Sequence, residues 1–151
     1  MLDTFQPLLA AADGVDLSDP TAAVATLTAR LDPRSPAGRR LSEELKSLLA
    51  AGKICERGAP PVRYGRVSKA VEATRHFSID VVHMDGPGPH HAHPLGEANW
   101  CIALDGEPRF DGRPEGWVVM PPGSAHVPTV SGGTMLIVYL LPQGQIQFTG
   151  A

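Results

Sequence analysis

The chain changes its pattern near residue 53, and this change limits the fold more than any other feature of the sequence. Before it, alanine and leucine recur at helical spacing in three stretches, roughly 2–12, 20–31 and 36–51. Ser35 suits the cap of the third stretch, Pro36 its first turn, and Gly52 the position just beyond its end. We therefore predict an N-terminal helical segment over 1–53.

After this boundary the sequence breaks into short β segments separated by turn residues. The candidate strands are Val62–Ala70, Phe77–Met84, Ala98–Leu104, Trp117–Met120, Thr134–Leu141 and Ile146–Phe148. Many short strands with glycine- and proline-rich turns indicate a sandwich or a barrel. We predict a mainly β fold, with a β-barrel domain over 54–151 on which the helical segment packs.

One apolar stripe on the third predicted helix, through Leu41, Leu45 and Leu48, must pack against something. The helices can cover the outside of a sheet or build a dimer contact, which is the interpretation that we favour. Alternatively, they cap the mouth of the barrel and shape a pocket. Because the stripe and the apolar strand faces exceed what one small barrel needs to cover itself, we predict a homodimer.

Length and charge narrow the class of protein. The 151 residues suit one small domain, and 13 basic against 16 acidic side chains give a formal charge of −3. No cluster of lysine and arginine suggests a nucleic-acid partner, and no apolar stretch of about eighteen residues suggests a membrane span. Since no export signal is evident, we predict a cytoplasmic protein in which Cys55 and Cys101 are free thiols.

Between Gly86 and His126 the chain holds four of its six histidines. His91 and His93 are two residues apart, so on an extended segment both side chains leave the same face, and Glu97 and His126 could close a site from neighbouring strands. Imidazole nitrogens and one carboxylate suit a borderline divalent cation. We predict one divalent metal ion, which could be manganese, iron, nickel, cobalt or zinc; the alternative is a solvated histidine loop.

These residues fall in two motifs, His91-x-His93-x-x-x-Glu97 and Pro121-x-Gly123-x-x-His126. The motifs resemble those of the cupin family, in which the first supplies two histidines and a glutamate and the second a third histidine. The resemblance implies a cupin double-stranded β-helix, or jelly-roll, barrel with His91, His93, Glu97 and His126 as metal ligands. The glycine spacings before and after the first motif depart from the usual pattern, but none of these departures falls on a ligand.

A larger part of the chain, from Ile54 to Phe148, resembles the bacterial 4-hydroxylaminobenzoate lyase family. The similar blocks are Ile54–Gly58, Arg63–Val67, Phe77–Asp80, Gly88–Pro94 and Glu97–Trp100. The resemblance implies a redox-neutral carbon–nitrogen lyase that converts 4-hydroxylaminobenzoate and water to 3,4-dihydroxybenzoate (protocatechuate) and ammonia in nitroaromatic degradation. It also implies a small aromatic carboxylate as substrate.

Several further residues are candidates for this chemistry. Glu97 could be a ligand or an acid/base beside a three-histidine metal, and His83 could relay protons or be a hydrogen-bonded core residue. A benzoate needs a cationic anchor, for which we prefer Arg66 with Tyr64 on its face over Arg63. Strand alternation also places Asn99 and Cys101 on the same face as Glu97, where they could line the substrate pocket.

Two other functions remain open for this sequence. One is a different metal-dependent cupin enzyme, a dioxygenase or decarboxylase, acting on a small aromatic acid. The other is a non-catalytic cupin that binds a small molecule. No DNA-binding helix-turn-helix is evident in the alanine-rich N-terminus, which counts against a transcription factor.

Overall fold

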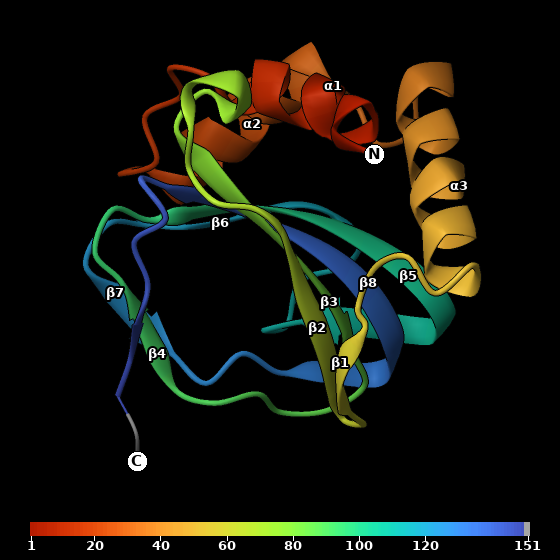
Figure 1. The fold of residues 1–151 in the computed structure, drawn as a ribbon. Coiled ribbons are helices and arrows are strands. Elements are labelled where there is room, and N and C mark those ends of the chain that lie inside the picture. The colour runs from red at the N-terminus through yellow and green to blue at the C-terminus, as the bar shows by residue number, and fades with distance from the viewer. Residues whose placement is uncertain (150–151) are drawn as a thin grey trace.

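The computed structural model describes residues 1–149 and has a mainly β, cupin-like fold with three helices at its N-terminus (Figure 1). The helices are α1 (Leu2–Ala12), α2 (Pro20–Arg30), α3 (Pro36–Ala50) and a short 3-10 helix, η1 (Glu72–Thr74). The strands are β1 (Arg57–Ala59), β2 (Val62–Ser68), β3 (Phe77–Met84), β4 (His91–His93), β5 (Glu97–Phe110), β6 (Gly116–Met120), β7 (Ser124–His126), β8 (Val130–Pro142) and β9 (Gln147–Phe148). The predicted fold class is confirmed.

The strands form two antiparallel sheets. Six strands follow the order β1-β2-β3-β8-β5-β6, and three follow the order β7-β4-β9. Figure 1 shows the two sheets as the two sides of an open barrel. We call the face of the larger sheet that carries Ile79, Trp100 and Leu140 the outer face, and the face that carries Val82, Cys101 and Tyr139 the inner face.

The two central strands, β5 and β8, are longer than the sequence predicts. β5 continues past Leu104, and β8 begins before Thr134. The added lengths pair with each other through two irregularities in the register. Gly106 has φ +66°, and a Cβ there would lie 2.5 Å from the carbonyl oxygen of Gly132. These glycines suggest turns in the sequence, but in the structure they lie at a bulge, where the two backbones approach too closely for any side chain.

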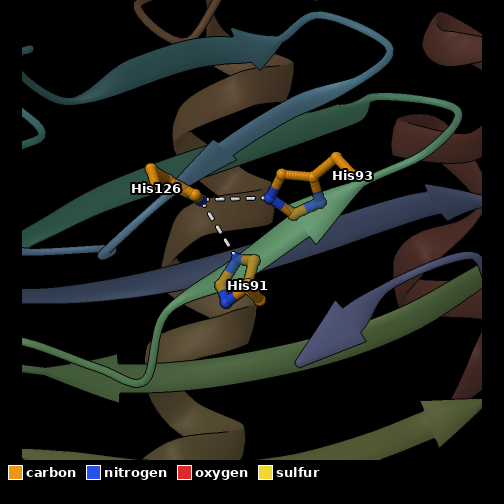
Figure 2. Close-up of side chains that lie close together, drawn as sticks. All are labelled: His91, His93 and His126. Carbon is orange, nitrogen blue, oxygen red and sulfur yellow. Dashed lines mark hydrogen bonds between the residues drawn. The ribbon is translucent and has the colours of Figure 1, made fainter. Parts of the chain in front are cut away.

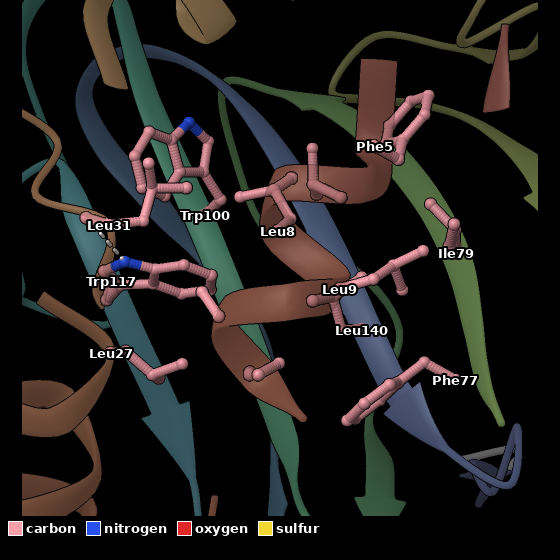
Figure 3. Close-up of a cluster of buried hydrophobic side chains, with 14 of the residues drawn as sticks. Phe5, Leu8, Leu9, Leu27, Leu31, Phe77, Ile79, Trp100, Trp117 and Leu140 are labelled. Atoms are coloured by element: carbon pink, nitrogen blue, oxygen red, sulfur yellow. Dashed lines mark hydrogen bonds between the residues drawn. The ribbon is translucent and has the colours of Figure 1, made fainter. Parts of the chain in front are cut away.

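The helices cover the outer face of the larger sheet (Figure 3). Phe5, Leu8 and Leu9 of α1 are fully buried in one continuous apolar cluster with side chains of the sheet. The indole nitrogen of Trp117 donates to the carbonyl oxygen of Leu31 at 2.9 Å, so this polar group is also satisfied. Burying each large apolar side chain contributes about 1.5–3 kcal/mol, and we infer that this face carries most of the stability.

The apolar stripe of α3 lies in the same cluster. Leu41 and Leu45 are buried and Leu48 packs against them from a half-buried position. Most of the stripe is therefore covered within a single chain. The homodimer stays a prediction, for which light scattering is the test: a monomer at every accessible concentration would contradict it.

Two further observations bear on the sequence predictions. Cys55 and Cys101 are both buried and neither forms a disulfide. Within residues 1–149, every helix is too short or too polar to cross a lipid bilayer.

Candidate metal centre

Three histidine side chains converge between the short strands β4 and β7 (Figure 2). Because side chains alternate along β4, His91 and His93 leave the same face, with Ala92 on the other. His126, on β7, lies directly opposite His91 in the antiparallel pairing of β7 with β4. Its Nε2 atom lies 3.0 Å from the Nε2 atoms of both His91 and His93. The structure thus brings together three of the four predicted ligands.

The protonation of these rings favours a cation between them. His91 donates from Nδ1 to the carbonyl oxygen of Pro89 at 3.1 Å, and His126 pairs through Nδ1 with a carboxylate. A neutral imidazole carries one proton, so the two Nε2 atoms face each other with lone pairs. Burial lowers the pKa of His91 to about 4 and that of His93 to about 3, which disfavours protonation at neutral pH. Two lone pairs at this separation repel unless a shared cation attracts both.

The donor set fits a divalent ion by type and by spacing. Nitrogen donors about 2.1 Å from one ion lie about 3.0 Å apart when they meet it at a right angle, and 3.0 Å is the separation observed. Imidazole suits zinc, copper, iron and nickel alike, so the donors select a class of metal rather than one element.

Glu97, the fourth predicted ligand, begins β5 beside this cluster. Its side chain is fully buried, and neither carboxylate oxygen has a hydrogen-bond partner. Oε1 lies 3.7 Å from Nε2 of His93. Burial raises the pKa of the Glu97 carboxyl to about 8, so without a metal it is largely protonated at neutral pH. An unsatisfied buried carboxyl is costly, and such groups in native structures commonly mark a bound ion or a catalytic role.

A cavity of about 930 Å³ adjoins His91. Its walls are largely apolar and include Val62, Val82, Met84, Pro128, Tyr139, Leu141, Ile146 and Phe148. Tyr64 and Arg66 line it from β2 and share one face of that strand. Nε and Nη2 of Arg66 donate to the two carboxylate oxygens of Asp80 at 2.9 and 3.2 Å. One edge of the guanidinium is therefore already paired, and Nη1 remains.

Comparison with known proteins identifies the chain. Residues 12–148 match the family described as "PnbB: 4-hydroxylaminobenzoate lyase". The chain belongs to this lyase family. Two proteins named 4-hydroxylaminobenzoate lyase are similar to it: one from Nocardioides sp. (strain LMS-CY) is 33% identical over 97 residues, and one from Pseudomonas putida is 32% identical over 109. The first alignment covers 59% of this chain and 57% of the relative, and the second covers 62% of each.

Solved structures with a related fold share less sequence with this lyase family member. A cupin-like protein from Thermotoga maritima has 16% identity and a TM-score of 0.42, over 63% of this chain and 84% of that one. Oxalate oxidase in complex with glycolate has 18% identity and a TM-score of 0.42, over 61% of this chain and 57% of that one.

The structure does not bring every candidate of the lyase site to the histidines. His83 follows Ile79 and Val81 on the outer face of β3, on the far side of the sheet from the inner face. His83 is half-buried there, away from the histidine cluster, so its position gives no support to a proton relay. Arg63 lies opposite His83 in the register and shares that face.

Asn99 and Cys101 do face inward with Glu97, as strand alternation predicts. The amide oxygen and nitrogen of Asn99 are buried without a hydrogen-bond partner. Cys101 packs in the apolar inner cluster, where burial raises the pKa of its thiol well above the usual range. Among residues 1–149, neither side chain belongs to the lining of the 930 Å³ cavity.

Three residues near the site were not found by sequence reasoning. Asp111 accepts a hydrogen bond from Nδ1 of His126 at 2.5 Å. Burial would raise the pKa of Asp111, but hydrogen bonds from His126 and from a backbone N–H hold it below its usual value. Arg57 and Phe148 both line the cavity, and the ring of Phe148 meets that of His91 edge-on at 5.5 Å. The dipeptide Asp111-Gly112 signals a hairpin turn, but nothing local links it to His126.

Proposed function

We propose that this protein catalyses the reaction for which its relatives are named, on 4-hydroxylaminobenzoate. One molecule of substrate and one of water would give one of protocatechuate and one of ammonia, with no external oxidant or reductant. The observation that carries the proposal is the convergence of three imidazoles, two of them buried, beside a cavity whose walls suit an aromatic ring. A family member with this site has both a place for a Lewis acid and a slot for the substrate.

We further propose that His91, His93 and His126 hold one divalent metal ion, drawn from manganese, iron, nickel, cobalt and zinc. Such an ion, when bound, would supply a Lewis acid that favours departure of the hydroxylamine oxygen. The 3.0 Å separation of Nε2 on His91 from Nε2 on His126 supports this role, since Nδ1 of each ring already meets an acceptor.

For Glu97 we favour the acid–base role over that of fourth ligand. It lies outside the three-histidine cluster, and neither of its buried oxygens has a hydrogen-bond partner, so both are free to exchange a proton. As an acid it can protonate the departing oxygen, and as the resulting base it can accept a proton from the water that attacks the adjacent ring carbon. The Glu97→Gln variant separates the roles: retained metal with lost turnover supports acid–base catalysis, whereas lost metal supports ligation.

Substrate binding is proposed to use the wall formed by β1 and β2. Arg66 would anchor the benzoate carboxylate through Nη1, held in place by Asp80, and Tyr64 would lie beside it. Arg57, paired with Tyr64 across the strands, is a second cation on this wall and makes no ion pair within residues 1–149. Asn99, two residues along from Glu97, would supply polar contacts near the reacting atoms, while we assign Cys101 and His83 to packing.

The decisive experiment is turnover without oxygen. Purified protein is loaded with each candidate metal and incubated anaerobically with 4-hydroxylaminobenzoate, and ammonia and protocatechuate are measured. Equal amounts of both products, absent with the His126→Ala variant, are expected. Turnover of a catechol that consumes oxygen would indicate a dioxygenase instead, and metal-dependent binding without any turnover would indicate a sensor.

A further inference from the structure

The hairpin between β5 and β6 ends in a tight turn whose first central residue is Asp111. Both central residues have positive φ, +48° at Asp111 and +82° at Gly112. Phe110 and Arg113 exchange both backbone hydrogen bonds, at 2.7 and 2.9 Å. An Asp-Gly pair suits this type of turn, because aspartate tolerates the left-handed backbone conformation and glycine adopts it without a steric clash. The turn fixes the direction in which the Asp111 carboxylate leaves the backbone.

That carboxylate joins the hairpin to the segment from His126 to Thr129, which follows 15 to 18 residues later in the sequence. Oδ2 accepts from Nδ1 of His126 at 2.5 Å, and Oδ1 accepts from the backbone N–H of Thr129 at 2.9 Å. The backbone N–H of Asp111 also donates to the carbonyl oxygen of Thr129 at 2.9 Å. His126 and Asp111 are both largely shielded from water, with 14% and 19% of their side chains exposed. Three hydrogen bonds thus dock the hairpin against the connection between β7 and β8.

The three histidines of the cluster are oriented by different means. Nδ1 of His126 meets a carboxylate, and Nδ1 of His91 meets the carbonyl oxygen of Pro89. Nδ1 of His93 is buried and has no hydrogen-bond partner. His126 is therefore the histidine whose ring is held by a charged acceptor, and its Nε2 lies 3.0 Å from Nε2 of each of the other two.

We propose that Asp111 is a positioning residue of the metal centre. It holds His126 as the tautomer with the proton on Nδ1, so that Nε2 presents its lone pair to the ion, and its charge makes that nitrogen a stronger donor. The inference rests on the proposed metal site, but it does not depend on the identity of the substrate or on turnover.

The test is the Asp111→Asn variant. The asparagine oxygen can still accept from Thr129, but its amide would face His126 as a donor and favour the tautomer with the proton on Nε2. Glu107→Gln is the matched control, because it removes the same charge from the same hairpin at an exposed side chain. Circular dichroism establishes that each variant is folded.

Two readouts are measured without substrate. Titration with Co²⁺ against a competing chelator should show affinity reduced about 10–100-fold in Asp111→Asn, the usual loss when such an outer partner is removed, and unchanged in Glu107→Gln. Nitrogen-15 NMR of the metal-free protein should show His126 protonated at Nδ1 in the wild type and at Nε2 in Asp111→Asn. Unchanged Co²⁺ affinity or an unchanged tautomer would overturn the proposal, as would a wild type that binds no metal. Metal binding as expected without lyase turnover would instead refute the proposed function alone.

Discussion

The two faces of the larger sheet are built from the same strands and have opposite characters. Along β5, Ala98, Trp100 and Ile102 point outward into the apolar cluster that the helices complete. Glu97 and Asn99 point inward and are buried with side-chain polar atoms that have no hydrogen-bond partner. On the outer face the polar indole nitrogens of both tryptophans have hydrogen-bond partners within the protein.

This difference separates stability from function. Apolar burial on the outer face stabilises the fold, while unsatisfied carboxyl and amide groups on the inner face cost free energy that a bound ion or substrate can recover. Since neighbours on one strand alternate between the faces, single substitutions one residue apart should have different consequences.

The largest effect is expected at the histidine cluster. His126→Ala or His91→Ala should abolish metal binding while the protein remains folded, because the helix-covered face does not contain these side chains. Elemental analysis of the purified variants measures this. His83→Ala, on the outer face, is the control that should keep its metal. Near-stoichiometric metal in the double histidine variant would show that the ion binds elsewhere.

The second effect belongs to the outer face. Trp100→Ala removes a fully buried ring that meets Trp117 edge-on at 5.0 Å, and should lower the free energy of unfolding by about 3–5 kcal/mol. Urea denaturation of the metal-free protein measures the loss. The folded fraction should still bind metal in the wild-type ratio. A loss under about 1 kcal/mol would contradict the assignment of stability to this face.

On β2, a substitution on the inner face should weaken substrate binding, whereas one on the outer face should not. Arg66→Lys keeps the charge but loses the planar fork, and should weaken binding of 4-hydroxylaminobenzoate by about 1.5–3 kcal/mol with metal content unchanged. Phenylhydroxylamine, which lacks the carboxylate, should hardly be affected. Arg63→Lys, on the outer face of the same strand, is the matched control. Equal losses on both substrates would remove Arg66 from the anchor role, and Arg57→Lys would then be tested in the same way.

The smallest effect is a pH dependence of the metal-free protein. Glu97 has a pKa of about 8 when folded and 4.5 as its ordinary value, so above pH 6.5 the folded state binds more protons than the unfolded state. The contribution of Glu97 to stability, taken as the difference between wild type and Glu97→Gln, should therefore fall by about 1–2 kcal/mol as the pH rises from 6.5 to 8. His91 and His93 have lowered pKa values and are neutral when folded, but when unfolded, with the ordinary pKa of 6.5, they still bind protons near pH 6.5, so they offset part of this decline in wild type and variant alike. In Glu97→Gln the decline should disappear; parallel curves for wild type and variant would contradict the assignment.

Much of this arrangement follows from local pattern. The first helix and the strand Phe77–Met84 have the bounds that the sequence predicts, because caps, prolines and periodicity act over a few residues. The shared face of His91 and His93 and the inward direction of Glu97 also follow from alternation along single strands. The match to the lyase family agrees with the resemblance that these motifs and the surrounding blocks carry.

Only the tertiary structure decided which residues pair across strands. The contact of Asp111 with His126 and the fork of Arg66 on Asp80 join residues 15 and 14 positions apart. The outward direction of His83 depends likewise on which face of β3 the helices cover. The sequence by itself determined which side chains share a face, because that depends on backbone geometry over two or four residues. Which faces meet, and which polar groups are left without partners, depends on strand register and helix packing, which arise only when distant segments come together.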